Sequence, residues 1–398
     1  MEPKIRLKGF SGEWEEKPLL DVVTLYNGLT YTPSDIRDRG TLVLRSSNVQ
    51  EGEIALFDNV YVKSDVATSP NVKKGDIIVV VRNGSRALIG KHAHIKEDMP
   101  NTVIGAFMSG MHTDEPEFMN ALLSTSSFDD EVNINLGATI NQITNGTFRS
   151  MKFHFPKKDE QKAIGAYFQH LDSLIQSTTK KIESLKQVKV ASLQAMFPQE
   201  GETTPRIRFK GFEGEWNCVE FGSIITECLD KTTIEDEDIL LSSAIDGVYL
   251  NSELFGHFRG KSNIGYRKLK KNMLILSAQN LHLGNANVNL RFEHGIVSPA
   301  YKIYYIHDCN PELLSHWIKR EETKKFFLDA TTAGASACRK NIVWEDLYKQ
   351  TLYLPKDELE QQKLASYLTS LTNQITLQTK RLEKLKQIKS ACLDNMFV

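Results

Sequence analysis

Two long stretches of the chain carry hydrophobic residues at alternating steps of three and four. The first seam comprises Phe168, Leu171, Ile175, Ile182 and Leu185, and the second comprises Leu368, Leu371, Ile375, Leu382 and Leu385. This spacing is the seam of a coiled coil and predicts two long helices, the first over 160–197, where there is no proline. Each seam could pack on its own domain or against the other helix. The matching register of the two seams favours pairing.

Shorter patterns lie between these helices. The apolar runs Ile77–Val81, Met273–Leu276 and Tyr301–Ile306 predict buried strands, because they are rich in β-branched and aromatic residues and end at turn-forming residues. Pro116–Phe128 and Pro311–Ala330 are expected to be helices. The two intervening regions are therefore predicted to be mixed α/β globules of about 150 residues each.

The chain contains an internal repeat at an offset of about 200 residues. Pro3–Trp14 matches Pro205–Trp216 at nine of twelve positions, and Thr179–Phe197 matches Thr379–Phe397 at eleven of nineteen. The regions between these blocks are far less alike. We therefore expect a constant frame that carries two modules of different specificity. The predicted boundaries are 1–158 for the first module, 159–198 for the first helix, 199–357 for the second module and 358–398 for the second helix.

Composition excludes several classes of protein. The 398 residues include 40% hydrophobic and 25% charged residues, as in an ordinary globular protein. The longest apolar run has five residues, Ile77–Val81, whereas a membrane span needs about 20. The five cysteines show no C-x-x-C spacing, so neither a disulfide framework nor a metal site is expected. We expect a cytoplasmic protein with no membrane partner.

Motifs of catalytic sites are missing or incomplete. The segment Gly256–Ser262 has three residues between its glycines, where a phosphate-binding P-loop needs four. No dinucleotide fingerprint follows a strand, and no two prolines are adjacent, as an adenine methyltransferase motif requires. The spacing of Glu322 and Lys324 occurs in nucleases but is common in a chain this rich in charge. We therefore expect no catalytic residues and no bound metal or cofactor.

Basic residues cluster at corresponding places in the two halves, although the net charge is only −1. Such local excess, followed by loops rich in arginine and amides, suits contacts with DNA phosphates and base edges. Solvated surface is the alternative. The candidate DNA-binding residues of the first half are Arg45, Lys73, Lys74, Arg82, Asn83, Arg86 and Lys91. Those of the second half are Arg259, Lys261, Arg267, Lys268, Lys270, Lys271, Gln279 and Asn280.

Four further motifs stand out: the Lys-Gly-Phe-x-Gly-Glu-Trp opening of each half, Gly75–Ile78, Val297–Tyr301 and Phe155–Gln161. Through these motifs the whole chain resembles the specificity subunits of type I restriction–modification systems. The second half departs from the pattern at Lys270–Met273, where the family often shows Gly-Asp. The resemblance implies an α+β fold with a pseudo-twofold repeat. Two mixed α/β target-recognition domains would be joined by two long antiparallel coiled-coil helices that act as a spacer.

The resemblance also implies function. Each half would read one part of a bipartite, asymmetric site in double-stranded DNA. The partners would be two modification (methyltransferase) subunits and two restriction (motor and nuclease) subunits. S-adenosylmethionine, ATP and magnesium would bind to those partners and not to this chain. The alternatives are a self-contained DNA methyltransferase or nuclease with an unrecognised active site, and a scaffold that binds only protein.

Overall fold

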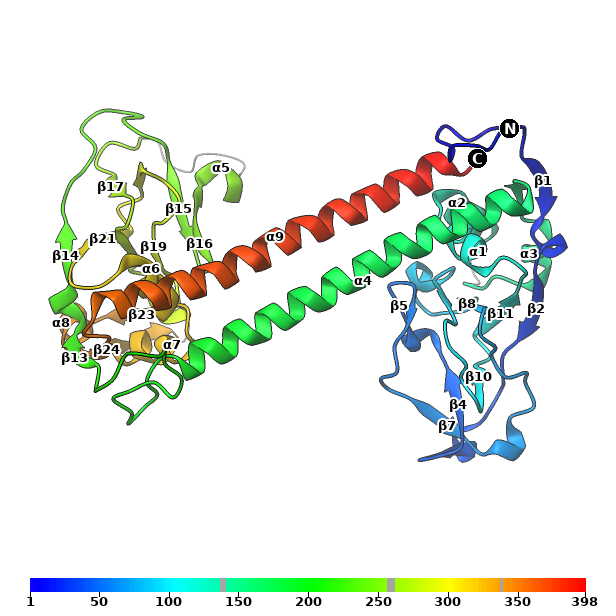
Figure 1. The fold of residues 1–398 in the computed structure, drawn as a ribbon, viewed down its shortest axis with the longest axis horizontal. Helices are drawn as coiled ribbons and strands as arrows, with labels where there is room; N and C mark the ends of the chain where they lie inside the picture. The colour runs from blue at the N-terminus through cyan, green and yellow to red at the C-terminus, as the bar shows by residue number, and fades with distance from the viewer. Residues whose placement is uncertain (137–140, 256–261, 337–338) are drawn as a thin grey trace. The chain divides into compact units, whose positions relative to one another are not determined.

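The computed structural model describes residues 1–136, 141–255, 262–336 and 339–398, and it divides into two compact units. Unit 1 consists of Met1–Lys180 together with Lys380–Val398, and unit 2 consists of Lys181–Thr379. Each unit therefore contains one part of each of the two long helices, α4 (Lys158–Ala195) and α9 (Glu358–Met396). Both chain termini lie in unit 1 (Figure 1), where the Ile5 amide donates to the Asn395 carbonyl at 2.8 Å.

Unit 1 is built on an antiparallel sheet with the strand order β2-β11-β8-β9. Three short helices and three further strand groups complete the described part of the unit. The central strands are β2 (Thr24–Asn27), β8 (Ile77–Val80), β9 (His92–His94) and β11 (Met108–His112). The second sheet, in the order β10-β4-β7-β3, comprises β3 (Ile36–Arg37), β4 (Thr41–Leu44), β7 (Val60–Val62) and β10 (Thr102–Ile104). The remaining elements are β1 (Glu15–Pro18) paired with β12 (Lys152–Phe155), β5 (Val49–Gln50) paired with β6 (Glu53–Ile54), α1 (Pro116–Leu122), α2 (Ser126–Asn135) and α3 (Asn145–Ser150).

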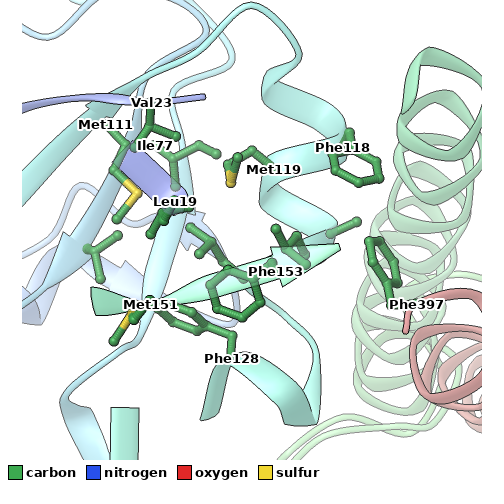
Figure 2. Packing of buried hydrophobic residues seen from close by; sticks show 14 of the residues in the cluster. Leu19, Val23, Ile77, Met111, Phe118, Met119, Phe128, Met151, Phe153 and Phe397 are labelled. Atoms are coloured by element: carbon green, nitrogen blue, oxygen red, sulfur yellow. The ribbon is translucent and has the colours of Figure 1, made fainter. Parts of the chain in front are cut away.

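The main core of unit 1 fills the space between the central sheet, α1, α2 and the long helices. Ile77 of β8 and Met111 of β11 are fully buried and face Leu19 and Met119 (Figure 2). Apolar residues at these positions are needed because the sheet is covered on this face. The same cluster includes residues of both α4 and α9, so the helix ends are part of the module's core.

Unit 2 repeats this architecture with the strand order β14-β21-β18-β19 in its central sheet. Its central strands are β14 (Ile225–Cys228), β18 (Leu274–Ser277), β19 (Ala286–Val288) and β21 (Tyr301–Ile306). Its strand pairs are β13 (Asn217–Glu220) with β24 (Thr351–Leu354), β15 (Leu241–Ala244) with β16 (Gly247–Leu250), β17 (Arg267–Lys270) with β20 (His294–Val297), and β22 (Thr331–Ser336) with β23 (Arg339–Ile342). Its short helices are α5 (Asn251–Leu254), α6 (Pro311–Ile318), α7 (Glu321–Asp329) and α8 (Trp344–Lys349).

The predicted strands are confirmed as β8, β18 and β21, but both predicted short helices were wrong in their extent. Pro116–Phe128 is interrupted after α1, because Thr125 takes an extended backbone conformation and its hydroxyl caps α2 by accepting from the Phe128 amide. Pro311–Ala330 is interrupted at Arg320, which is extended and precedes α7. A capping side chain therefore starts the second helix at Thr125, whereas the Arg320 side chain makes no capping hydrogen bond and only its backbone conformation interrupts the helix.

The two predicted long helices are confirmed, and their seams face inward. Every seam residue named above is buried or half-buried. The ends of the seams pack in the domain cores. Phe168 and Leu171 belong to the core cluster of unit 1 together with Leu393 and Met396 of α9, and Leu368 belongs to that of unit 2 together with Leu193 of α4. Pairing of the two seams along the rest of the helices stays a prediction.

Polar contacts show that the helices run antiparallel in unit 1. The hydroxyl of Tyr167 lies 3.3 Å from the thiol of Cys392, and Lys389 Nζ donates to Asp172 Oδ1 at 2.6 Å. A later residue of α4 therefore meets an earlier residue of α9. In unit 2, Ser192 Oγ lies 3.2 Å from the hydroxyl of Tyr367. Tyr367 corresponds by the repeat to Tyr167, and Ser192 corresponds to Cys392.

A buried ion pair joins the opening block of each half to the start of a long helix. Arg6 donates through Nε and Nη2 to the two oxygens of Glu160, both at 2.8 Å, and Glu160 is 3% exposed. Arg208 binds Glu360 in the same way in unit 2, at 2.6 and 2.7 Å. The repeated sequence blocks thus make repeated contacts.

The tryptophan of each block packs edge-on against a phenylalanine near the end of a long helix. The ring centroids of Trp14 and Phe397 are 6.1 Å apart, and those of Trp216 and Phe197 are 6.0 Å apart. In each unit the opening block packs on the end of the helix that carries the repeated Met-Phe. The constant frame is therefore a packing unit and not only a sequence repeat.

The departure at Lys270–Met273 preserves the turn that precedes the central strand. Gly75 has φ +93° before β8, and Asn272 takes its place before β18 with φ +65°, a conformation that asparagine tolerates. The Lys73 amide donates to the carboxylate of Asp76 at 2.9 Å, and the Lys270 amide contacts the sulfur of Met273 at 3.1 Å. The same turn is therefore built from different residues.

None of the described helices has an apolar stretch long enough to cross a membrane.

Candidate nucleic-acid interface

The strongest candidate site lies where the central strand of each sheet ends. β8 ends at Val80 and is followed by the loop Arg82–Arg86, and β18 ends at Ser277 and is followed by Gln279 and Asn280. These loops occupy equivalent places, because β8 and β18 are equivalent strands in sheets of the same order. Two different sequences are thus presented by the same scaffold.

The structure does not bring all the predicted residues together. Lys73 and Lys74 precede β8, so they lie at the opposite end of the strand from Arg82 and Arg86. A four-residue strand separates the two groups by about 13 Å. Lys73 and Lys74 are exposed, and neither makes an ion pair within the described part of the chain. They stay candidates for phosphate contacts away from the loops.

Unit 1 has a groove of about 630 Å³ beside the loop that follows β8. We call it the unit 1 groove. Its lining combines apolar side chains with hydrogen-bonding side chains from separate segments of sequence. Its lining residues are Leu29, Thr30, Tyr31, Pro33, Ile36, Arg45, Ser46, Ser47, Asp58, Asn83, Gly105, Ala106, Phe107 and Met108.

Arg45 and Asn83 meet in this groove, but internal contacts already use their polar groups. Arg45 Nη2 donates to the carbonyl and the carboxylate of Asp58, both at 2.7 Å. Asn83 Nδ2 donates to Ser46 Oγ at 3.1 Å, and its Oδ1 accepts from the Ser85 amide at 2.9 Å. These side chains hold the loops in place. Their predicted base contacts would require exchange of these partners.

Arg82 is the most available of the predicted base contacts in unit 1. It is exposed, and its guanidinium carbon lies 5.2 Å from the ring centroid of Phe107. Arg86 is also exposed and donates to the Asn133 carbonyl at 3.1 Å. Lys91 is exposed at the same end of the sheet, because it directly precedes β9. Arg82, Arg86 and Lys91 therefore form one basic edge.

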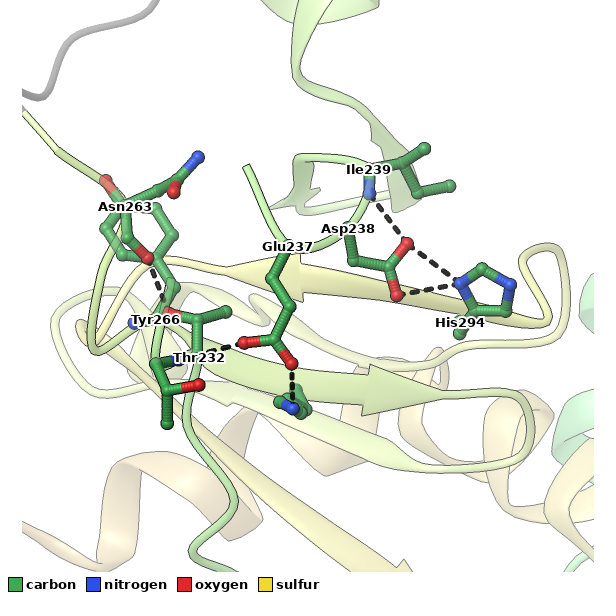
Figure 3. A network of polar contacts seen from close by, with 9 residues as sticks. Thr232, Glu237, Asp238, Ile239, Asn263, Tyr266 and His294 are labelled. Atoms are coloured by element: carbon green, nitrogen blue, oxygen red, sulfur yellow. Dashed lines mark hydrogen bonds and ion pairs between the residues drawn. The ribbon is translucent and has the colours of Figure 1, made fainter. Parts of the chain in front are cut away.

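The basic run of unit 2 is largely neutralised within the unit. Lys268 binds the carboxylate of Glu237, which raises the pKa of Lys268 and lowers that of Glu237 through their shared hydrogen bond. Glu237 also accepts from the Thr233 amide, and the neighbouring Asp238 lies 2.7 Å from His294 Nδ1 (Figure 3). These contacts pin the loop before β15 onto the pair β17 and β20.

The other cations of this run differ in availability. The Arg267 side chain is only 16% exposed and lies 3.9 Å from Glu227, so its burial makes it the weakest of the predicted DNA contacts. Lys271 is paired with Glu293 at 2.5 Å on the surface, where a phosphate could replace the carboxylate. Lys270 is exposed and makes no ion pair with any described residue. Arg259 and Lys261 lie outside the described residues.

Gln279 and Asn280 are both exposed at the tip that follows β18. The Asn280 amide donates to Ser277 Oγ at 3.3 Å, which ties the tip to the end of the strand. The side chains thus project from an anchored backbone. This is the arrangement that hydrogen bonding to base edges requires.

Sequence reasoning missed Phe107, Tyr31 and Ser47 as components of the candidate site. Ser47 Oγ and Arg45 Nε are buried in the groove wall without a hydrogen-bond partner among the described residues. The only sequence signal for Phe107 is an aromatic residue in a glycine-containing turn between two strands. That signal is weak, because it does not tell whether the ring is exposed.

The nearest approach to a catalytic arrangement is a buried carboxylate in unit 1. Asp76 accepts from the hydroxyl of Tyr26 at 2.7 Å and lies 3.0 Å from His112 Nδ1. Burial and the adjacent carboxylate raise the pKa of Tyr26, so its hydroxyl stays protonated and braces the sheet. In the described ranges, no group of three or more histidine, cysteine or acidic residues is arranged to hold a metal ion.

Comparison with known proteins agrees with this description. Residues 11–187 match the family model described as the type I restriction modification DNA specificity domain. The specificity subunit of the type I restriction enzyme EcoKI from Escherichia coli is 22% identical over 94% of this chain and 87% of its own length. The StySPI specificity subunit from Salmonella potsdam is 25% identical over 54% of this chain, and the match spans about half (48%) of that relative's length.

Solved structures show the same fold. The specificity subunit from M. genitalium superposes with a TM-score of 0.63 and 14% identity, over 100% of this chain and 99% of that one. A chain from a structural study of type I restriction–modification complex assembly gives a TM-score of 0.50 and 14% identity, over 96% and 97% of the two chains. Residues 11–187 are thus similar to the type I restriction modification DNA specificity domain, and the chain as a whole is similar in sequence to specificity subunits of type I restriction enzymes.

Proposed function

We propose that this chain is the non-catalytic DNA-recognition subunit of a type I restriction–modification complex. Each unit reads one part of a bipartite, asymmetric site in double-stranded DNA. The loop after β8 serves unit 1, and the tip after β18 serves unit 2.

One observation carries the proposal. The central sheets of the two units have the same strand order, and equivalent strands end in different loop sequences, Arg82–Arg86 in one unit and Gln279 with Asn280 in the other. A repeated scaffold with divergent tips suits the reading of two unlike sequences, because base specificity comes from side chains at base edges.

The partners are inferred from the similarity to type I specificity subunits. We propose that the chain assembles with two modification subunits and two restriction subunits in the cytoplasm. S-adenosylmethionine, ATP and magnesium would be bound by those subunits. The relatives from E. coli and Salmonella are named specificity subunits of type I restriction enzymes, which supports this assignment.

A module exchange tests the proposal. Residues 1–158 are replaced by the equivalent part of a related subunit, and methylated adenines are mapped in cells that also carry the modification subunit. We expect one half of the recognised site to change and the other half to stay the same. A change in both halves would contradict independent reading.

The alternatives predict different results. A self-contained methyltransferase or nuclease would methylate or cut DNA as the purified single chain, with S-adenosylmethionine or magnesium added. A protein-binding scaffold would give a complex that binds all duplexes equally. Sequence-dependent binding by the assembled complex, with no turnover by the chain alone, supports the recognition subunit.

Single substitutions at the basic edge of unit 1 separate two kinds of contact. Arg82→Ala is expected to cost about 1–3 kcal/mol of binding and to relax specificity at one position, because a bidentate contact with a base is lost. Lys91→Ala should weaken binding to all sequences alike and reduce the salt dependence by about one charge. Competition binding at several salt concentrations distinguishes the two. An Arg82→Ala variant with unchanged specificity would remove Arg82 from the site.

A further inference from the structure

Phe107 is an aromatic residue that unit 1 presents to solvent on a rigid turn. Its side chain is 52% exposed, although it lies between the buried strands β10 and β11. The Phe107 carbonyl accepts from the Val81 amide at 2.9 Å and from the Arg82 amide at 3.2 Å. The backbone that carries the ring is therefore anchored to the loop that follows β8. An exposed phenyl ring gains free energy when a partner covers it.

The surroundings of the ring combine apolar and hydrogen-bonding surface. Phe107 lines the unit 1 groove together with its neighbours Ala106 and Met108, and Tyr31 and Asn83 belong to the same lining. The major groove of DNA offers base edges to such hydrogen-bonding groups. The thymine 5-methyl is the apolar group that the four bases display there. Apolar side chains beside the predicted base contacts therefore match thymine.

The position of Arg82 argues against insertion of the ring between base pairs. The guanidinium lies over the ring, with its carbon 5.2 Å from the ring centroid. An inserted ring needs both faces free to stack on bases, whereas Arg82 covers one face of this ring. The edge of Phe107 stays available, and a methyl group can pack against an edge.

We propose that Phe107 is a specificity-determining residue that contacts the 5-methyl group of a thymine in the half-site read by unit 1, while Arg82 reads the neighbouring base. This proposal rests on the proposed function, because it assumes that the loop after β8 enters the major groove.

The test replaces each thymine of the unit 1 half-site in turn by uracil, which lacks only the methyl group. The affinity of the complex of full-length chain and modification subunit is measured for each duplex. We expect uracil at one position to weaken binding about three- to tenfold. Phe107→Ala should weaken binding to the thymine duplex by a similar factor and should bind the uracil duplex as tightly as the unchanged protein does.

The uracil duplex also controls for misfolding, because a damaged variant would bind it poorly as well. Phe57→Ala is the matched control, since Phe57 is 48% exposed in the same unit and does not line the groove. This variant should keep the full uracil effect. The proposal is overturned if no thymine is sensitive to uracil, or if the sensitivity persists undiminished in Phe107→Ala. Loss of all sequence preference in the unchanged complex would instead contradict the proposed function.

Discussion

The buried ion pair between Arg208 and Glu360 provides a quantitative test of the frame. Glu360 is 2% exposed and receives two hydrogen bonds from Arg208, at 2.6 and 2.7 Å. Arg208→Met leaves this carboxylate buried without a countercharge, which costs about 3–5 kcal/mol. The lost hydrogen bond to the Gly214 carbonyl adds little, because Gly214 is exposed and water can replace the guanidinium. A domain has only about 5–15 kcal/mol of stability in total, so the loss should be large.

Urea unfolding of the full chain, followed by tryptophan fluorescence, measures this loss. The double variant Arg208→Met with Glu360→Met should recover most of it, because no uncompensated charge is left. Arg206→Met is the control: Arg206 pairs with Glu202 on the surface, and the loss should be below about 1 kcal/mol. The reasoning is refuted if Arg208→Met costs no more than Arg206→Met, or if the double variant is as unstable as the single one.

Three further predictions concern the helices and their packing. Lys189 is half-buried, its pKa is lowered by burial, and it makes no ion pair within the described ranges. Thr372 is related by the repeat to Asp172, so Thr372→Asp should raise the pKa of Lys189 and stabilise unit 2 by about 1 kcal/mol. An unchanged urea midpoint would argue against this prediction. Burial lowers the pKa of His316 from 6.5 to about 4, so the stability that depends on its neutral ring is complete above pH 6.5 and falls by up to about 3 kcal/mol as the pH drops toward 4. His316→Gln should flatten this dependence between pH 7 and 5, and an equally steep loss in the variant would exclude His316 as its source. Four residues inserted after Thr179 add about 6 Å to α4 and should lengthen the non-specific spacer of the DNA site by about one or two base pairs. Methylation mapping measures the spacer. The original spacer with normal activity would show that α4 does not set this distance.

The sequence by itself determined the repeat, the long helices and the central strands. These features depend on patterns that are local in the chain. The alternating three- and four-residue steps specify a helix face, and the apolar run Ile77–Val81 can be satisfied only by burial. The paired contacts of Arg6 and Arg208 could also be anticipated as equivalent, because they lie in blocks that match at nine of twelve positions.

Only the tertiary structure decided which charged residues are available and where they meet. The run Arg267–Lys271 looks uniformly basic in sequence, yet Glu227, Glu237 and Glu293 from other segments neutralise most of it. Such pairing depends on which strands become neighbours, and a one-dimensional pattern of charge does not contain that information.

The residues of the unit 1 groove also could not be grouped from the sequence. Arg45, Asn83 and Phe107 are separated by more than twenty residues in sequence and come together because strand order and two turns place their loops side by side. The turn before β18 is a further case: the sequence shows Asn272 where the first half has Gly75, and the shared positive φ shows that the backbone turn is nevertheless the same. Local hydrophobic spacing is dictated by the geometry of a single element, whereas a binding surface is assembled from elements distant in sequence, whose meeting depends on packing throughout the unit.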